Sequence, residues 1–225
     1  VVTIEDPIEY NIRYVNQTQI NPAAGITFAS ALRSLLRQDP NIILVGEIRD
    51  NETADIAVNA ALTGHLLLST VHTNDAATVV PRLLDMKVLP FLVAAVMNVA
   101  LAQRLVGKIC ADCIESYKPE PRLLDLIQKQ VEEMGIENYK PSKVLYRGRG
   151  CKSCGNTGLK GRIGIYETIV FNEEIRAYIS SPDFSLEGLK KIARKAGMIS
   201  MYEDGIRKAE RGMTTIEEVF RVIRE

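Results

Sequence analysis

The chain has no excess of charge of either sign. Its 28 lysine and arginine residues equal its 28 aspartate and glutamate residues, so the formal net charge is zero. A balanced charge argues against a whole-surface field for nucleic acid or anionic lipid, although it leaves room for a local patch. We expect neither a nucleic-acid partner nor a signal peptide at the start of the chain.

Long hydrophobic runs are also missing. The longest apolar stretch, 88–102, is about half a dozen residues shorter than a membrane-spanning helix, and Pro90 and Asn98 interrupt it. We therefore predict a buried helix at 88–102. With 46% hydrophobic and 25% charged residues over 225 positions, the composition is that of a soluble globular protein with one or two compact subdomains.

Cysteine is scarce, and its placement is informative. The four cysteines form two Cys-x-x-Cys pairs, Cys110 with Cys113 and Cys151 with Cys154. Two such turns supply the four thiolates of a tetrahedral zinc shell, and a filled shell predicts a structural rather than a catalytic metal. The alternatives are four reduced buried thiols, or disulfides in a secreted chain. Reduced pairs fit a cytosolic compartment.

The only two histidines, His65 and His72, flank a predicted strand. At about 3.3 Å per residue an extended segment places them roughly 20 Å apart, so they cannot share a metal.

The first 107 residues alternate short apolar runs with helical patterns, which is typical of an α/β fold with a parallel sheet covered by helices. The run 42–45 lacks polar alternation and predicts a central strand buried on both faces. Strands are predicted at 1–4, 42–45 and 66–71, and helices at 27–38 and 52–62.

Polar side chains follow these strands at their carboxyl ends. Glu5 and Asp6 come after the first strand, Glu47 after the second and His72 after the third. Ligands of an open parallel sheet bind outside the carboxyl ends of its strands, so we expect a site there, with His65 at the opposite end. Taken singly, each residue is more often an ordinary polar group at a strand end.

Together these residues are of the types that a site for a nucleoside triphosphate needs. Mg²⁺ prefers carboxylate, hydroxyl and water oxygens, and Glu47 can act as the base for a water that attacks the γ-phosphate. The charge that develops on the transferred phosphoryl group needs guanidinium groups, in cis or toward a neighbouring subunit. The candidates are Arg33, Arg37 and Arg49.

Three segments resemble motifs of one family, the secretion-ATPase superfamily of hexameric motors for type II secretion and type IV pilus assembly (the GspE/PilB group). Residues 3–10 resemble its Asp box, 42–50 its Walker B segment and 64–76 its His box. Further co-linear similarity lies at 101–105 leading into the cysteines, 164–167 and 214–219. The resemblance covers nearly the whole chain, and its tetracysteine segment favours assembly and secretion motors over retraction motors.

The resemblance implies a RecA-like P-loop NTPase fold, with ATP and magnesium as ligands of the full-length protein. It implies that Glu5 and Asp6 lie near the magnesium and γ-phosphate, that Glu47 polarises the lytic water and that His72 senses the γ-phosphate. The arginine set around the phosphates and subunit boundary is implied to include Arg33, Arg37 and Arg49.

The same resemblance implies a homo-hexamer in the cytoplasm, at the inner face of the inner membrane, bound to platform proteins of a secretion or pilus machine. One family feature is missing, because no Gly-x-x-x-x-Gly-Lys-[Ser/Thr] loop occurs in the 225 residues. We therefore expect the chain to be the C-terminal part of a longer protein whose upstream part holds the Walker A loop, and the isolated chain to be inactive and a poor binder of ATP.

The sequence divides into an incomplete ATPase core at 1–107, a tetracysteine zinc subdomain at 108–157, and a returning strand with a helical C-terminal subdomain at 158–225. We predict that strand at 161–170, joining the main sheet. Thr215 and Glu218 predict a capping box. The tetracysteine subdomain is expected to bury too little apolar area to fold alone. Zinc is therefore expected to supply on the order of 10 kcal/mol of its folding free energy, and the subdomain should melt first without metal. Helices are predicted at 121–134, 185–196, 200–212 and 215–224.

Two other functions remain open. Lys108, Arg147, Arg149 and Lys152 crowd the cysteines, as in a zinc-ribbon nucleic-acid module, which would bind with strong salt dependence. That segment offers few aromatic side chains for base stacking. The second alternative is a non-catalytic assembly scaffold, which is tested by whether fusing the upstream loop restores a hydrolysis that Glu47→Gln abolishes.

Overall fold

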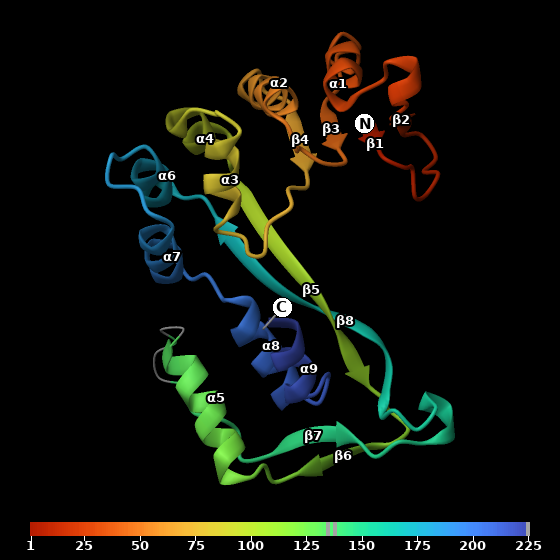
Figure 1. Cartoon of the computed structure of the whole chain (residues 1–225), viewed down its shortest axis with the longest axis vertical. Helices are drawn as coiled ribbons and strands as arrows, with labels where there is room; N and C mark the ends of the chain where they lie inside the picture. Colours follow the sequence, from red (N-terminus) through yellow and green to blue (C-terminus); the bar gives the residue numbers. More distant parts are fainter. Residues whose placement is uncertain (134–135, 137–138, 224–225) are drawn as a thin grey trace. The chain divides into compact units, whose positions relative to one another are not determined.

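A computed structural model of the chain describes residues 1–133, 136 and 139–223, which form two compact units (Figure 1). Unit 1 comprises Val1–Ala100 and Ile169–Ala196, and unit 2 comprises Leu101–Thr168 and Gly197–Glu225. The three-part division at 107 and 157 follows sequence motifs and stays a proposal. Among the described residues no helix combines the length and apolarity needed to cross a bilayer.

Unit 1 is built on a four-stranded parallel sheet of order β2-β1-β3-β4. Three of its strands were predicted. The other, β2, was missed because its sequence, Asn-Gln-Thr-Gln, has no apolar side chain. The strands are β1 Val2–Glu5, β2 Asn16–Gln19, β3 Ile42–Val45 and β4 Leu66–Ser69.

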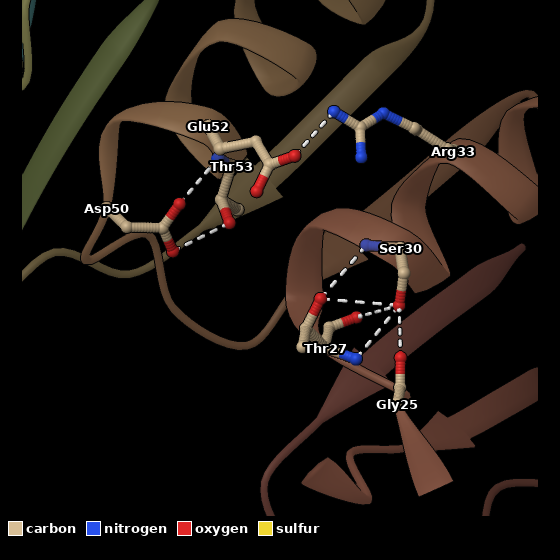
Figure 2. A network of polar contacts seen from close by, with 7 residues as sticks. All are labelled: Gly25, Thr27, Ser30, Arg33, Asp50, Glu52 and Thr53. Atoms are coloured by element: carbon tan, nitrogen blue, oxygen red, sulfur yellow. Dashed lines mark hydrogen bonds and ion pairs between the residues drawn. The ribbon is translucent and has the colours of Figure 1, made fainter.

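The two predicted helices of unit 1 are α1 Phe28–Leu36 and α2 Asn51–Leu62. Side chains fix where both begin (Figure 2). Thr27 Oγ1 accepts the Ser30 N–H at 3.2 Å and Ser30 Oγ accepts the Thr27 N–H at 2.9 Å, while Asp50 accepts the Thr53 N–H at 2.8 Å. These caps satisfy N–H groups that a helix leaves open.

The central strand is fully buried on one face. Ile43 and Val45 have no exposed surface, whereas Ile42 and Leu44 are partly exposed. The prediction of burial on both faces is therefore wrong for half of this strand. On the neighbouring edge strand β4, Leu66 and Leu68 are each about half exposed.

The apolar stretch 88–102 is not one helix, contrary to the prediction. Helix α4, Pro90–Val96, has its proline in the first turn and ends at Met97, whose backbone is extended. The chain then becomes β5, Val99–Ile109, in which Ala100 and Ala102 are buried while Val99 and Leu101 are exposed. This period of two is that of a strand.

The C-terminal stretch of unit 1 folds onto the helices that follow the sheet. The C-terminal stretch consists of α6 Glu173–Ile179 and α7 Leu186–Lys195, and the helices after the sheet are α3 Val79–Asp85 and α4. Helix α6 contacts both α4 and α7. Arg176 of α6 donates to the carbonyls of Phe171 and Ala95, both at 3.0 Å, to Asn98 Oδ1 at 2.9 Å and to the Ala94 carbonyl. One guanidinium thus satisfies carbonyl groups at the end of α4.

The long strand β8, Leu159–Val170, most of which lies in unit 2, pairs with β5 in a separate two-stranded sheet. The prediction that this strand joins the main sheet is therefore wrong. A second pair, antiparallel, consists of β6 Ile114–Tyr117 and β7 Leu145–Gly148.

Three helices of unit 2 share a hydrophobic core. They are α5 Pro121–Glu133, α8 Met201–Glu210 and α9 Ile216–Ile223, and Figure 1 shows α5 beside α8. The predicted ends of two of these helices, Met134 and Arg224, lie outside the described residues. The core residues are Ile127, Val131, Leu145, Tyr202, Ile206, Ala209, Ile216 and Val219. Part of 108–157 therefore shares its core with the C-terminal helices, because α5 packs on α8 and α9.

The predicted capping box at α9 forms on one side. Thr215 Oγ1 accepts the Glu218 N–H at 3.3 Å. The Glu218 carboxylate instead accepts the N–H of Gly107 in β5 at 2.6 Å and pairs with Arg221. A long-range contact has replaced the expected local one.

Candidate functional site

The loops after β3 and β4 bring an acid and an imidazole together. Glu47 follows β3, His72 follows β4, and His72 Nε2 lies 2.9 Å from Glu47 Oε2. The Glu47 side chain is 18% exposed, whereas that of His72 is 82% exposed. The carboxylate is held close to the protein while the imidazole remains open to a ligand.

Two hydrogen bonds, one between backbone groups and one from a side-chain hydroxyl, fix these loops against each other. The Ile48 N–H donates to the Thr70 carbonyl at 3.0 Å, and Thr70 Oγ1 donates to the Gly46 carbonyl at 2.6 Å. Gly46 also donates to the Ile4 carbonyl at 2.7 Å, and a Cβ at Gly46 would lie 3.0 Å from that oxygen. A glycine at position 46 therefore allows β1 and the Glu47 loop to approach closely.

Arg49 links this pair to the loop after β1. Its guanidinium pairs with Glu47 and lies 3.3 Å from Asp6 Oδ2, and it also lies 5.7 Å from the centre of the Phe28 ring. The structure thus brings together Asp6, Glu47, Arg49 and His72, four of the residues expected at this edge.

Glu5 ends β1 at the same edge but has other partners. Its carboxylate accepts hydrogen bonds from Thr3 Oγ1 at 2.5 Å and Gln17 Nε2 at 2.9 Å. These two bonds, chiefly that from Thr3, lower the pKa of Glu5, so the group is ionised and negative at neutral pH. Sequence reasoning missed Gln17, because β2 carries no apolar signal.

The other two arginines lie on α1 and at its C-cap, and they do not join this network in the described structure. Arg33 pairs with Glu52 of α2 at 2.6 Å, and both side chains are more than half exposed (Figure 2). Arg37 is exposed at the C-cap of α1. His65 precedes β4, where its Nδ1 lies 3.0 Å from the Ala60 carbonyl oxygen.

The four cysteines form a second candidate site, in unit 2. Their Sγ atoms all lie within 4.8 Å of one another, with separations of 3.9 Å for Cys110 and Cys151, 3.9 Å for Cys113 and Cys154, and 3.7 Å for Cys151 and Cys154. Zn–S bonds of about 2.3 Å in a tetrahedron place sulfur atoms about 3.8 Å apart. The donor set therefore fits a zinc ion.

Backbone N–H groups favour negative charge on one member of this cluster, Cys154. Cys154 Sγ accepts the N–H of Cys151 at 3.2 Å and that of Gly158 at 3.3 Å. Burial opposes ionisation of Cys154, but these N–H groups lower its pKa to about 6. Burial raises the pKa of Cys113 to about 12. Hydrogen bonds to thiolate sulfur favour the ionised form that a metal needs.

The basic residues near the cysteines are partly committed to internal partners. Arg147 Nε lies 2.9 Å from Glu115 Oε1, Arg149 Nε lies 3.5 Å from Glu115 Oε2, and Arg147 covers the Tyr117 ring at 5.2 Å. Ion-paired arginines contribute less to phosphate binding than solvated ones, which weakens the nucleic-acid alternative.

Comparison with known proteins identifies the relatives of this chain. A family profile described as "Type II/IV secretion system protein" matches residues 1–221. The type IV pilus assembly ATPase PilB of Thermus thermophilus is 51% identical over 217 residues, and the type II secretion system protein E of Pseudomonas aeruginosa is 45% identical over 225 residues. A crystal structure of the pilus retraction motor PilT with bound ADP matches with a TM-score of 0.66 at 26% identity, over 99% of this chain and 52% of that one.

These relatives are longer than the chain. The matches cover 96% of the chain but 24% of the Thermus protein, and 100% of the chain but 43% of the Pseudomonas protein. The mixed α/β architecture with a parallel sheet and a four-cysteine cluster agrees with the predicted fold class.

Proposed function

The chain belongs to the type II/IV secretion system protein family, and from this premise we propose that it is part of an ATPase that powers type II protein secretion or type IV pilus assembly. The contact between Glu47 and His72 at the carboxyl edge of a parallel sheet carries the proposal. That edge is where α/β proteins bind their ligands.

We assign the residues distinct roles. Glu47 orients the attacking water and takes up its proton, while its neighbours Arg49 and His72 hold the carboxylate in place. His72 is exposed and also contacts the γ-phosphate. Glu5 and Asp6 offer the oxygen ligands that magnesium prefers, and the metal supplies charge neutralisation when bound. Arg33 and Arg37 serve the subunit boundary rather than the Glu47 network.

The phosphate-binding loop is the component that these residues do not supply. Since the 225 residues contain no Gly-x-x-x-x-Gly-Lys-[Ser/Thr] sequence, we propose that a complete site needs such a loop from outside them and that this chain alone binds ATP weakly. Isothermal titration with ATP tests this directly. Micromolar affinity for residues 1–225 would contradict it.

The remaining assignments complete the proposal. Zinc in the Cys110, Cys113, Cys151 and Cys154 cluster is structural, because four thiolates leave no open coordination position. The active assembly is a homo-hexamer in the cytoplasm that acts on platform proteins at the inner face of the inner membrane. The ring places the exposed arginines of α1 near a neighbouring subunit.

Substitution of Glu47 tests the function. The variant is made in an intact protein that is as long as the relatives. Glu47→Gln keeps the shape of the side chain but removes its basicity, so ATP turnover should fall by at least about 100-fold while ATP binding changes little. Glu174→Gln, on the exposed start of α6, is the matched control and should keep full turnover. Wild-type turnover in Glu47→Gln would contradict the role of Glu47, whereas an intact protein without ATP turnover would favour the scaffold alternative.

A further inference from the structure

The His72 loop is held at its far end by an aspartate that sequence reasoning gave no role. Asp75 Oδ1 accepts the N–H of Thr78 at 2.8 Å and its hydroxyl at 2.5 Å, at the N-cap of α3. The Thr73 hydroxyl in turn donates to the Asp75 carbonyl at 3.1 Å. Asp75 therefore folds the residues directly after His72 into a fixed turn.

A lysine from a distant part of the chain completes this arrangement. Lys190 Nζ of α7 lies 2.6 Å from Asp75 Oδ2, although 115 residues separate the two in sequence. Both residues belong to unit 1. The Asp75 side chain is 26% exposed and that of Lys190 is 42% exposed. Burial opposes ionisation of Asp75, yet the bonds from Lys190 and Thr78 lower its pKa, which keeps the pair charged.

The His72 loop thus has two anchors. At its start, Thr70 is bonded to the Glu47 loop through Gly46 and Ile48. At its end, Asp75 is bonded to Lys190. His72 lies between them, with an exposed ring whose contact with Glu47 depends on where the loop holds it.

We propose that Lys190 is a positioning residue for His72, acting through Asp75 to fix the loop that presents the imidazole to Glu47 and to nucleotide. The role of the imidazole rests on the proposed function, whereas the anchoring of the loop does not. Lys190 itself touches neither Glu47 nor His72 in the described contacts.

The neighbouring lysine provides a matched control. Lys191 pairs with Glu187 of the same helix at 2.7 Å, and their side chains are 74% and 80% exposed. That pair joins two positions one turn apart and tethers no other element. Loss of either lysine removes one positive charge from α7, but only loss of Lys190 frees Asp75.

The two histidines allow a test that does not depend on activity. In the 225-residue chain labelled with ¹⁵N-histidine, Lys190→Met and Asp75→Asn should each shift or broaden the ring resonances of His72. The resonances of His65, at the other end of β4, should stay unchanged and serve as the internal reference. Lys190→Arg should restore the wild-type spectrum, and Lys191→Met should leave it unaltered. Unchanged His72 resonances in both Lys190→Met and Asp75→Asn would overturn the proposal.

Kinetics of the intact protein provide the second test. Lys190→Met should lower kcat for ATP hydrolysis at least fivefold while KM for ATP changes less than twofold, because Lys190 does not contact nucleotide. Lys190→Arg should recover at least half of the rate, and Lys191→Met should retain all of it. An equal loss in Lys190→Met and Lys191→Met would overturn a specific role for Lys190.

The two proposals fail in different ways. If the intact protein hydrolyses no ATP while Lys190→Met moves the His72 resonances, the anchor stands and the ATPase assignment fails. If Glu47→Gln abolishes hydrolysis while Lys190→Met changes neither rate nor spectrum, the ATPase assignment stands and the anchor fails.

Discussion

His72 and Glu47 lie 25 residues apart in the sequence, and their side chains meet at 2.9 Å because two parallel strands end side by side. In the register of β3 and β4, Val45 lies opposite Ser69. Glu47 and His72 follow these two positions closely, so the sheet itself brings the groups together. A shift of one residue in this register would turn the side chains of β4 to the other face of the sheet and displace the loop that follows.

The cysteine cluster should depend on the close approach of Gly148 and Gly158, neither of which is a metal ligand. A Cβ at Gly148 would lie 2.1 Å from the Gly158 carbonyl oxygen, which no side-chain rearrangement can relieve. Gly148→Ala should therefore separate the two cysteine turns and reduce bound zinc to less than half of one equivalent per chain, as measured by atomic absorption.

Gly155 provides the control for that substitution. It adopts a φ of +60°, and a Cβ added at this position would meet no atom within 4 Å. Asparagine tolerates this left-handed conformation, so Gly155→Asn should keep a full equivalent of zinc. Equal zinc contents in Gly148→Ala and Gly155→Asn would contradict the close approach seen in the structure.

Removal of zinc should loosen the cysteine turns and leave α5 folded. Because α5 shares a core with α8 and α9, its amides should stay protected from hydrogen exchange after chelation. Amides of 110–113 and 151–158 should lose protection, since the metal would hold them in place. Simultaneous loss of protection in α5 would instead favour the expectation from sequence that 108–157 melts as one subdomain.

Glu218 should make unit 2 sensitive to acid. The hydrogen bond from Arg221 is the main reason that the pKa of Glu218 is lowered, and the Gly107 N–H adds to it despite partial burial. A folded-state pKa below the unfolded value means that this stability is fully present above the unfolded pKa of about 4.3 and is lost as pH falls through the folded pKa. Glu218→Gln should therefore lower the free energy of unfolding at pH 7 by about 1–2 kcal/mol and reduce its decline in acid.

Urea denaturation at pH 7 and pH 3 measures both effects. Glu217→Gln is the matched control, because Glu217 is the exposed neighbour on the same helix. An identical acid dependence in Glu218→Gln and wild type would show that this carboxylate contributes nothing to the pH response.

The elements predicted best are those whose secondary structure is determined by the local pattern of their own residues. Ile42–Val45 was predicted as a strand from its β-branched and apolar side chains, and the helix after Thr27 from the helical spacing of its apolar residues. Glu47 and His72 were selected as candidates because each closely follows a predicted strand, and their side chains lie in contact. The spacing of the cysteines likewise predicted their clustering.

Several of the misses share a physical cause, which is pairing between distant segments. Ala100 and Leu101 favour helix intrinsically, but pairing with β8 makes this stretch a strand. Glu218 had a local capping partner by sequence, but it bonds to Gly107, 111 residues away. Lys190 and Asp75 gave no local signal of their contact for the same reason.

We propose that Glu47 and His72 act as one unit in ATP hydrolysis. A double-mutant cycle of steady-state turnover in the intact protein, with Glu47→Gln, His72→Ala and the double variant, tests it most directly. If the two side chains act together, the double variant should be no more than about twofold slower than Glu47→Gln alone. A double variant whose loss equals the product of the two single losses would contradict the account.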